Sequence, residues 1–210
     1  MIVVHHLNNS RSQRVLWLLE ELGVPYEVAR YQRDPETRLA PRELKSVHPL
    51  GKSPIIVDDG QTIAETGLIF EYLCDHYDNG ALAPSKGVDA DKSERLRWLY
   101  WLHYAEGSGM PPLLLKLVIS GLPPTAAAEL QEKLVDPQVA LQVDYWEAQL
   151  DRTGWFAGPK FSAADVIMGF PVEAAVLRLG MGANRSNLKA FLDRIHARAA
   201  YQRAQQRGQG

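Results

Sequence analysis

Apolar and polar residues alternate between strand-like and helix-like patterns over the first eighty positions. Short apolar runs at residues 2–4 and 26–31 each predict a strand. Between them, residues 10–23 carry apolar side chains at helical spacing on one face: Val15, Leu18, Leu19 and Leu22. Gly23 and Pro25 end this helix, because glycine is favoured just past a helix and proline cannot continue one. The chain therefore opens with a strand, a helix and a strand.

The segment that follows is polar and contains several prolines. Residues 32–49 predict an irregular arm with one short helix. Residues 54–57 and 61–63 flank an Asp-Gly pair, which is a strong turn signal, and predict a hairpin. From Glu65 a further helix is expected, with one face formed by Ile69, Tyr72, Leu73 and His76.

Composition changes after this helix, because residues 78–90 are rich in Gly, Pro, Asp and Ala and indicate a linker. No later segment has a strand pattern. Helices are expected in four stretches: residues 95–105, 126–150, 162–179, and around Leu188, Phe191, Leu192 and Ile195. The predicted fold class is an α/β domain (βαβ, hairpin, α) over residues 1–79, a linker over 80–90, and an all-helical domain over 91–210.

Prolines, the C-terminal tail and a capping motif modify the helices predicted for the second half of the chain. Pro137 predicts a break in the second stretch, and Pro171 predicts a kink or break near residues 166–170. The polar tail from Gln205 to the C-terminus is expected to fray. Ser162 and Asp165 fit a capping box at the start of a helix, so we interpret Asp165 as structural rather than catalytic.

Composition excludes several classes of protein. Of the 210 residues 46% are hydrophobic and 23% charged, and the net charge of −2 lacks the basic excess that nucleic-acid binding requires. No apolar run approaches the roughly 18 residues that span a bilayer, and the N-terminus does not resemble a signal peptide. The single cysteine, Cys74, cannot form an intrachain disulfide, which favours the cytoplasm, and we expect it to be a core thiol.

The sequence contains no motif that indicates metal binding or redox chemistry by a cysteine thiol. His5 and His6 are adjacent, so on a strand they would point to opposite faces, and no Cys/His cluster or H-E-x-x-H motif occurs. We therefore expect no metal site. A thioredoxin-like oxidoreductase needs a cysteine before the first helix, where this chain has Ser10, Arg11, Ser12 and Gln13.

Three segments in order, residues 10–16, 48–55 and 63–69, resemble the glutathione transferase superfamily. The second is similar to its N-P-x-G-x-V-P-x-L segment and the third to its [EQ]-S-x-x-I segment. Residues 158–165 resemble its helical N-capping segment, and residues 103–112 resemble bacterial and fungal serine-type members. The resemblance implies a thioredoxin-like N-terminal domain, an all-helical C-terminal domain, a homodimer, and glutathione as co-substrate in detoxification chemistry.

The resemblance also implies which residues bind glutathione. Ser53, before a cis-Pro54, would pair its backbone with the cysteinyl part of glutathione. Glu65 would accept from the γ-glutamyl ammonium, and Thr66, at a helix start, would bind the carboxylate. Lys52 would meet the glycyl carboxylate. Leu39 stands where some relatives carry a histidine for that carboxylate, which leaves this second contact open, with Arg38 and Arg42 as neighbours.

The residue that activates the thiol is expected before the first helix. A serine hydroxyl donates a hydrogen bond to the thiolate and favours the ionised form. Ser10, four residues before Arg14, has the spacing of theta-like members, with Asn9 and Ser12 as alternatives. Ser10 and Gln13 also fit a capping box, which is compatible with donation.

The acceptor is expected to be a small-molecule electrophile. The resemblance places Tyr104, Glu106 and Met110, with Trp101 as a further candidate, over the thiolate, although aromatic spacing on a helix more often reflects packing. Conjugation is the predicted reaction. Glutathione-dependent peroxide reduction is the first alternative, and a catalytically silent dimerisation module is the second.

Overall fold

The computed structural model describes residues 1–87 and 91–209, so residues 88–90, which fall in the expected linker, and residue 210 lie outside the described residues. The chain forms two compact units. The first comprises Met1–Ala83 together with His196–Gly210, and the second comprises Pro84–Ile195.

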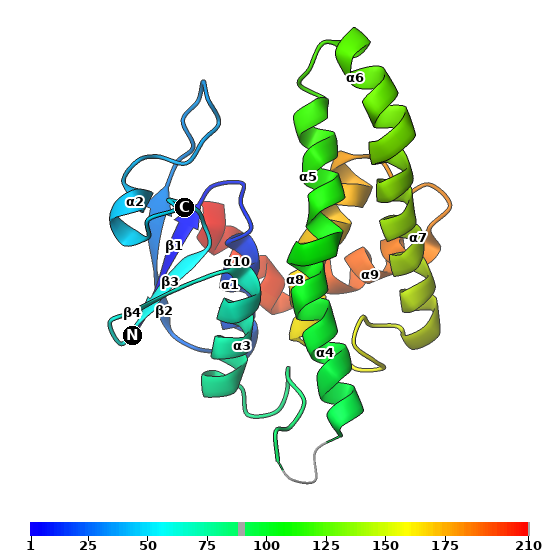
Figure 1. Ribbon diagram of the computed structural model, residues 1–210. Coiled ribbons are helices and arrows are strands. Elements are labelled where there is room, and N and C mark those ends of the chain that lie inside the picture. Colours follow the sequence, from blue (N-terminus) through cyan, green and yellow to red (C-terminus); the bar gives the residue numbers. More distant parts are fainter. Residues whose placement is uncertain (88–90, 210) are drawn as a thin grey trace. The chain divides into compact units, whose positions relative to one another are not determined.

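A four-stranded mixed sheet forms the centre of the first unit (Figure 1). Its strands are β1 (Ile2–Leu7), β2 (Tyr26–Tyr31), β3 (Ile55–Asp58) and β4 (Gln61–Ala64), in the spatial order β2-β1-β3-β4. β1 is parallel to β2 and antiparallel to β3, and β3 and β4 form the predicted hairpin. This is the thioredoxin-like domain that the sequence indicated.

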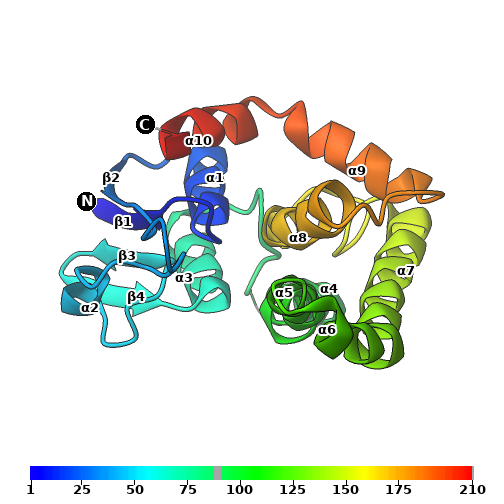
Figure 2. The same cartoon turned by 90° about the horizontal axis from the view of Figure 1, so that it is seen from above.

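Four helices accompany this sheet. They are α1 (Gln13–Leu22), the short α2 (Leu44–Val47), α3 (Thr66–Tyr77) and α10 (Ala199–Gln209). Figure 2 shows α1 and α3 on one face of the sheet and α10 packed against α1. At the predicted face positions, Leu18, Leu19, Ile69 and Leu73 have no exposed surface and form the core. The predicted positions Leu22 and Tyr72 are only partly buried, and His76 is exposed.

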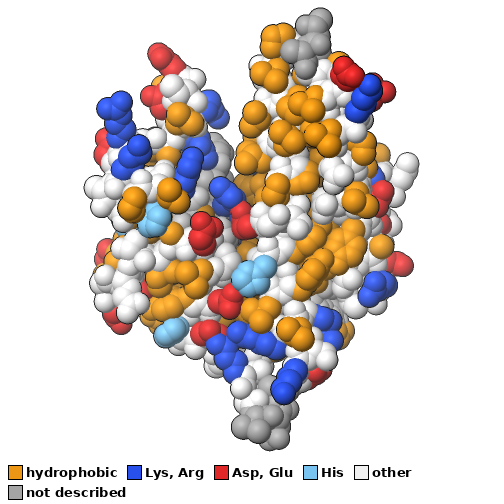
Figure 3. Space-filling model, viewed as in Figure 1, with side chains coloured by type: hydrophobic (Ala, Val, Ile, Leu, Met, Phe, Trp, Pro, Cys, Tyr) orange, Lys and Arg blue, Asp and Glu red, His pale blue; other side chains and the backbone are white. Residues whose placement is uncertain are grey.

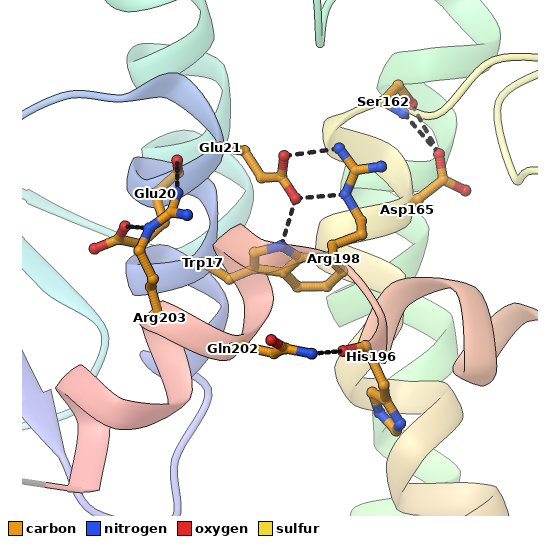
Figure 4. A network of polar contacts seen from close by, with 9 residues as sticks. All are labelled: Trp17, Glu20, Glu21, Ser162, Asp165, His196, Arg198, Gln202 and Arg203. Carbon is orange, nitrogen blue, oxygen red and sulfur yellow. Dashed lines mark hydrogen bonds and ion pairs between the residues drawn. The ribbon is translucent and has the colours of Figure 1, made fainter.

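The C-terminal segment differs from the expectation. The tail from Gln205 was expected to fray, but α10 continues to Gln209 and belongs to the first unit rather than to the helical domain. Figure 4 shows the reason, because Arg198 binds Glu21 at 2.6 and 2.8 Å and Arg203 binds Glu20 at 2.6 Å. Sequence pattern could not show these contacts, since they join residues about 180 positions apart.

The start of α1 also differs. The expected helix from Ser10 begins at Gln13, with Ser12 at the N-cap and no side-chain cap bond. The capping box proposed for Ser10 and Gln13 therefore does not form. The Ser10 hydroxyl instead contacts the Ser12 hydroxyl at 2.7 Å.

The second unit is helical. Its elements are α4 (Lys92–Tyr104), η1 (Ala105–Gly109), α5 (Met110–Ile119), α6 (Pro124–Leu130), η2 (Gln131–Val135), α7 (Asp136–Thr153), α8 (Ala163–Glu173), η3 (Ala174–Arg178) and α9 (Ser186–His196). The three η segments are wide π-helical turns, each of which continues directly from the helix before it. η1 connects α4 to α5, a helix that the sequence pattern missed, η2 connects α6 to α7, and η3 follows α8.

Helical structure continues through both prolines, so the predicted breaks at Pro137 and Pro171 are wrong, while the kink predicted near Pro171 stays a prediction. Pro137 lies in the first turn of α7, where a missing N–H has no intrahelical partner to lose, and η2 precedes it. Pro171 lies inside α8, which continues past it to Glu173 before η3 widens the turn.

The predicted capping box at the start of α8 is confirmed. The Ser162 hydroxyl accepts from the Ala164 N–H at 3.3 Å, and the Asp165 carboxylate accepts from the Ser162 N–H at 2.8 Å. Its other oxygen accepts from the Phe156 N–H at 2.8 Å. Asp165 is fully buried and acts as a structural residue.

Candidate functional site

The strand register brings three separate chain segments to one edge of the sheet. His5 on β1 pairs with Ile55 at the start of β3, and Ile55 pairs with Ala64 at the end of β4. Because β1 and β4 run antiparallel to β3, the end of β1, the start of β3 and the end of β4 coincide. In the sequence, Ser10 follows β1, Ser53 precedes β3 and Glu65 follows β4.

Ser53 is held firmly at this edge. The peptide bond between Ser53 and Pro54 is cis, as the sequence predicted. The Ser53 hydroxyl donates to the carbonyl of His5 at 3.0 Å, and the residue is 8% exposed. The backbone that leads into β3 is therefore tied to β1.

Glu65 and Thr66 begin α3 at the same edge. Glu65 is the N-cap residue and has φ 73° and ψ 121°, a left-handed conformation that costs a non-glycine residue free energy. Its side chain is exposed, whereas Thr66 is buried. The first N–H groups of α3 have no intrahelical partner, so the start of this helix suits a carboxylate. Strain of this kind is concentrated at binding sites.

Two serines form a hydroxyl pair before α1. The Ser10 and Ser12 Oγ atoms lie 2.7 Å apart, and the Ser12 N–H donates to Ser10 Oγ at 3.3 Å. Ser12 has no exposed surface, and its hydroxyl lies 2.8 Å from Nδ1 of His6. Ser10 is 6% exposed and is the more accessible of the two. Asn9 is exposed and has φ 49°.

Positive charge gathers around the loop that contains these serines. Arg33 donates from its guanidinium to the Asn8 carbonyl at 3.2 Å and to the Arg38 carbonyl at 3.0 Å. Burial and the neighbouring charges of Arg38 and Arg11 lower the pKa of Arg33. The positive charges of Arg11 and Arg38 therefore act on Arg33, and this combined positive potential favours an anion nearby. Lys52, which precedes Ser53 in the sequence, is exposed.

Comparison with known proteins identifies the family. The family models for the N-terminal and C-terminal domains of glutathione S-transferase match residues 1–75 and 110–199. A glutathione S-transferase 1 of Saccharomyces cerevisiae is 36% identical over 197 residues, which cover 85% of this chain and 82% of the relative. The chain belongs to the glutathione S-transferase family.

Further relatives agree with this assignment. A glutathione S-transferase 3 of Schizosaccharomyces pombe is 37% identical over 83% of this chain and 74% of its own length. The crystal structure of a glutathione S-transferase from Actinobacillus pleuropneumoniae superposes with a TM-score of 0.85 at 32% identity, covering 100% of this chain and 94% of that one. The protein is thus a transferase with glutathione as co-substrate.

The candidate acceptor residues of this transferase lie in the helical unit, in and around η1. Trp101 is 2% exposed and packs against Phe156 and Tyr145, with ring centroids 4.7 and 5.4 Å away. Its ring therefore lacks the exposed surface that an acceptor contact requires. Tyr104 is half-buried and accepts from the Trp146 indole N–H at 2.9 Å.

Glu106 and Met110 are each half-buried. Glu106 lies within η1, and Met110 begins α5. Burial raises the pKa of Tyr104 to about 12, so its hydroxyl stays protonated and donates to Gln142. The transferase therefore presents Tyr104, Glu106 and Met110 with more accessible surface than Trp101.

Two other residues complete the description of the transferase. Cys74 is buried, as predicted. His6, which the sequence interpretation passed over, contacts Ser12 and is 4% exposed. A signal did exist, because His6 continues the alternation of Ile2 and Val4 and therefore falls on the buried face of β1.

Within residues 1–87 and 91–209, no cluster of three or more His, Cys, Asp or Glu side chains is suitable for a metal. Within the same ranges, no helix has the length and apolar character needed to span a bilayer.

Proposed function

We propose that this transferase conjugates glutathione to a small electrophilic molecule through the edge of the sheet where Ser10, Ser53 and Glu65 meet. The register that brings the ends of β1, β3 and β4 together is the observation that carries the proposal. A γ-linked tripeptide needs a backbone partner, an ammonium acceptor and a carboxylate site. In this proposal Ser53 supplies the first, Glu65 and the start of α3 supply the other two, and Ser10 supplies a hydrogen-bond donor to sulfur.

In this proposal the backbone of Ser53 pairs with the cysteinyl residue of glutathione as a short added strand. The exposed carboxylate of Glu65 accepts from the γ-glutamyl ammonium. The start of α3 at Thr66 binds the γ-glutamyl carboxylate. Lys52 binds the glycyl carboxylate. The left-handed backbone of Glu65 supports this arrangement, since strain persists where function requires it.

Ser10 stabilises the thiolate by donating its hydroxyl proton to sulfur. The complete burial of Ser12 supports Ser10 over Ser12 for that contact, and Asn9 remains the alternative donor. The guanidinium groups of Arg11, Arg33 and Arg38 add positive potential that favours the ionised thiol. Catalysis then rests on a stabilised thiolate held beside the acceptor.

The helical unit supplies the acceptor contacts in this proposal. Tyr104, Glu106 and Met110 contact the electrophile, and Trp101 supports them from beneath through its packing. Conjugation to halogenated or unsaturated carbon is the proposed reaction. Glutathione-dependent peroxide reduction, which uses the same thiolate, is distinguished by assaying an organic hydroperoxide in parallel.

Retention on a glutathione matrix followed by a chromogenic aryl-halide assay tests the proposal. Retention with turnover supports it, and failure to bind would favour a silent dimerisation module. Ser10→Ala should raise the apparent pKa of bound glutathione and lower kcat, while the affinity for glutathione changes little because the three clamps remain. Asn9→Ala tests the alternative donor and should leave the pH–rate profile unchanged. An unchanged pH–rate profile for Ser10→Ala would assign thiol activation elsewhere.

We also propose that the transferase is a cytoplasmic homodimer. Apolar side chains gather over α4, α5 and α7 (Figure 3). Leu96 and Tyr100 on α4 and Leu141 and Tyr145 on α7 are exposed at helical spacing, and the two tyrosine hydroxyls meet at 3.1 Å. An exposed apolar face of this kind suits a second copy of the chain. Sedimentation of Leu141→Glu tests it, with monomers expected and unchanged dimers contradicting the assignment.

A further inference from the structure

A buried chain of hydrogen bonds leads from Ser10 through the interior of the first unit to its last helix. The Ser10 hydroxyl contacts the Ser12 hydroxyl at 2.7 Å, and Ser12 Oγ lies 2.8 Å from Nδ1 of His6. Nε2 of His6 lies 3.2 Å from the carbonyl oxygen of Gly208, in the last turn of α10. Ser10, Ser12 and His6 are 6%, 0% and 4% exposed, so the chain is shielded from water.

The Gly208 carbonyl fixes where the protons lie. A carbonyl only accepts, so Nε2 of His6 carries the proton and donates it. In the neutral ring Nδ1 is then an acceptor, and the Ser12 hydroxyl donates to it. Nδ1 of His6 at 2.8 Å is a nearer acceptor for the Ser12 proton than the Leu7 carbonyl at 3.4 Å, and Ser12 Oγ can in turn accept from the Ser10 hydroxyl at 2.7 Å. Before the thiol reacts, the hydroxyl protons of Ser10 and Ser12 therefore both point along the hydrogen-bond chain toward His6.

We propose that His6 receives the thiol proton of glutathione through the hydroxyls of Ser12 and Ser10. This inference rests on the proposed function. The S–H bond breaks as its proton binds Ser10 Oγ, the Ser10 proton passes to Ser12 Oγ, and the Ser12 proton passes to Nδ1 of His6. The sulfur keeps the electron pair and becomes a thiolate, and His6 becomes an imidazolium.

The product state satisfies every hydrogen-bonding group in the chain. The imidazolium donates to Ser12 from Nδ1 and to Gly208 from Nε2, and Ser12 donates to Ser10. Ser10 then donates to the thiolate, which is the role that the proposed function gives it. Without the transfer, Ser12 would donate to His6 and Ser10 to sulfur, leaving two oxygens 2.7 Å apart with no proton between them. His6 touches neither sulfur nor substrate and is a positioning residue.

The surroundings of His6 suit a group that is neutral at rest. Burial, together with the nearby charge of Arg30 on β2, lowers the pKa of His6, while the Gly208 carbonyl opposes this change. On α10 the facing group is that carbonyl, and on the loop before α1 it is Ser12. Carbonyls at a helix C-terminus favour a cation, so the end of α10 stabilises the imidazolium once it forms. A new thiolate charge would add to that effect.

Two measurements on the full-length protein with reduced glutathione test the relay. Ultraviolet absorbance of the thiolate against pH gives the apparent pKa of the bound thiol. Binding calorimetry in buffers of different ionisation enthalpy counts the protons released. In the wild-type protein the thiolate should form with little proton release, because the proton stays on His6. His6→Asn keeps an oxygen that can accept from Ser12 but cannot hold the proton.

For His6→Asn we expect the apparent pKa of the thiol to rise by about one unit, so kcat/KM near that pKa falls roughly tenfold. The thiolate that does form should release one proton to the buffer. KM for glutathione should stay nearly unchanged, because Ser53, Glu65 and Thr66 are intact. His76→Asn, at an exposed histidine on α3, is the matched control and should behave as wild type.

The outcomes separate the relay from the proposed function. If the wild-type protein forms no thiolate with glutathione, both are overturned. If it forms the thiolate but His6→Asn shows the same pKa and the same proton release, the relay alone is overturned. Should His6→Asn fail to fold, Ser12→Ala interrupts the chain at its middle while leaving His6 in place. The same two readouts then apply, and wild-type behaviour of Ser12→Ala overturns the relay.

Discussion

The attachment of α10 can be tested at its ion pair with α1. Arg198 donates to both carboxylate oxygens of Glu21, at 2.6 and 2.8 Å, and the Trp17 indole N–H donates to the same carboxylate at 2.8 Å (Figure 4). The Glu21 side chain is 8% exposed and that of Arg198 is 33% exposed. The pair is therefore intermediate between a surface ion pair and a buried one. The substitution Arg198→Ala removes this ion pair.

The expected cost follows from those exposures. Breaking a buried pair costs about 3–5 kcal/mol and breaking a surface pair about 0–1 kcal/mol. Glu21 would keep its bond from Trp17, so it would not be left without a donor. We therefore expect Arg198→Ala to lower the free energy of unfolding of the first unit by about 2 kcal/mol. Arg203→Ala, at a more exposed arginine that binds Glu20, is the control and should cost under about 1 kcal/mol.

Urea unfolding followed by circular dichroism gives the change in stability, and hydrogen exchange of the α10 amides locates it. Hydrogen exchange is the more informative assay, because it reports on α10 itself even if the two compact units do not unfold in one step. In Arg198→Ala the α10 amides should lose protection while those of α7 keep theirs. A loss of stability below about 0.5 kcal/mol with unchanged α10 protection would show that the ion pair contributes nothing and that apolar packing holds the helix.

Three further predictions concern single side chains. Glu65→Gly should raise stability by about 1 kcal/mol, because glycine adopts φ 73° without strain, yet weaken glutathione binding measured by calorimetry. Tyr104→Phe should lower the stability of the helical unit by about 1–3 kcal/mol in thermal unfolding, since Trp146 and Gln142 lose their partner. Burial lowers the pKa of His6, so the folded protein binds this proton less readily than the unfolded chain. Stability should therefore be present above the unfolded pKa of about 6.5 and decline as the pH falls below it, less so in His6→Asn.

The sequence predicted most of the first unit because its signals are local. Alternating and helical spacings located β1, β2 and α1, and the turn at Asp59 located the hairpin. Sequence order alone also indicated Ser53 and Glu65 as site candidates. Their meeting at one edge needed the strand register, which depends on pairing between distant segments.

Errors arose where long-range packing or wide turns decide the structure. Pro171 was expected to kink or break its helix, but α8 continues to Glu173 and η3 follows it directly. Polarity made the tail look unstable, although Ala200 and Ala204 are buried on α10 and Arg198 and Arg203 bind α1. His6 was judged only as a metal ligand, because its partner Gly208 lies 202 residues away.

The return of α10 to the first unit makes that unit discontinuous along the chain. Synthesis on the ribosome begins with the sheet and α1 but delivers their final covering helix last, after the whole helical unit. Until then the ring of Trp17, which meets Tyr201 of α10 edge-on at 5.1 Å, has no partner from that helix. The unit that emerges first is therefore the one that reaches its complete packing last.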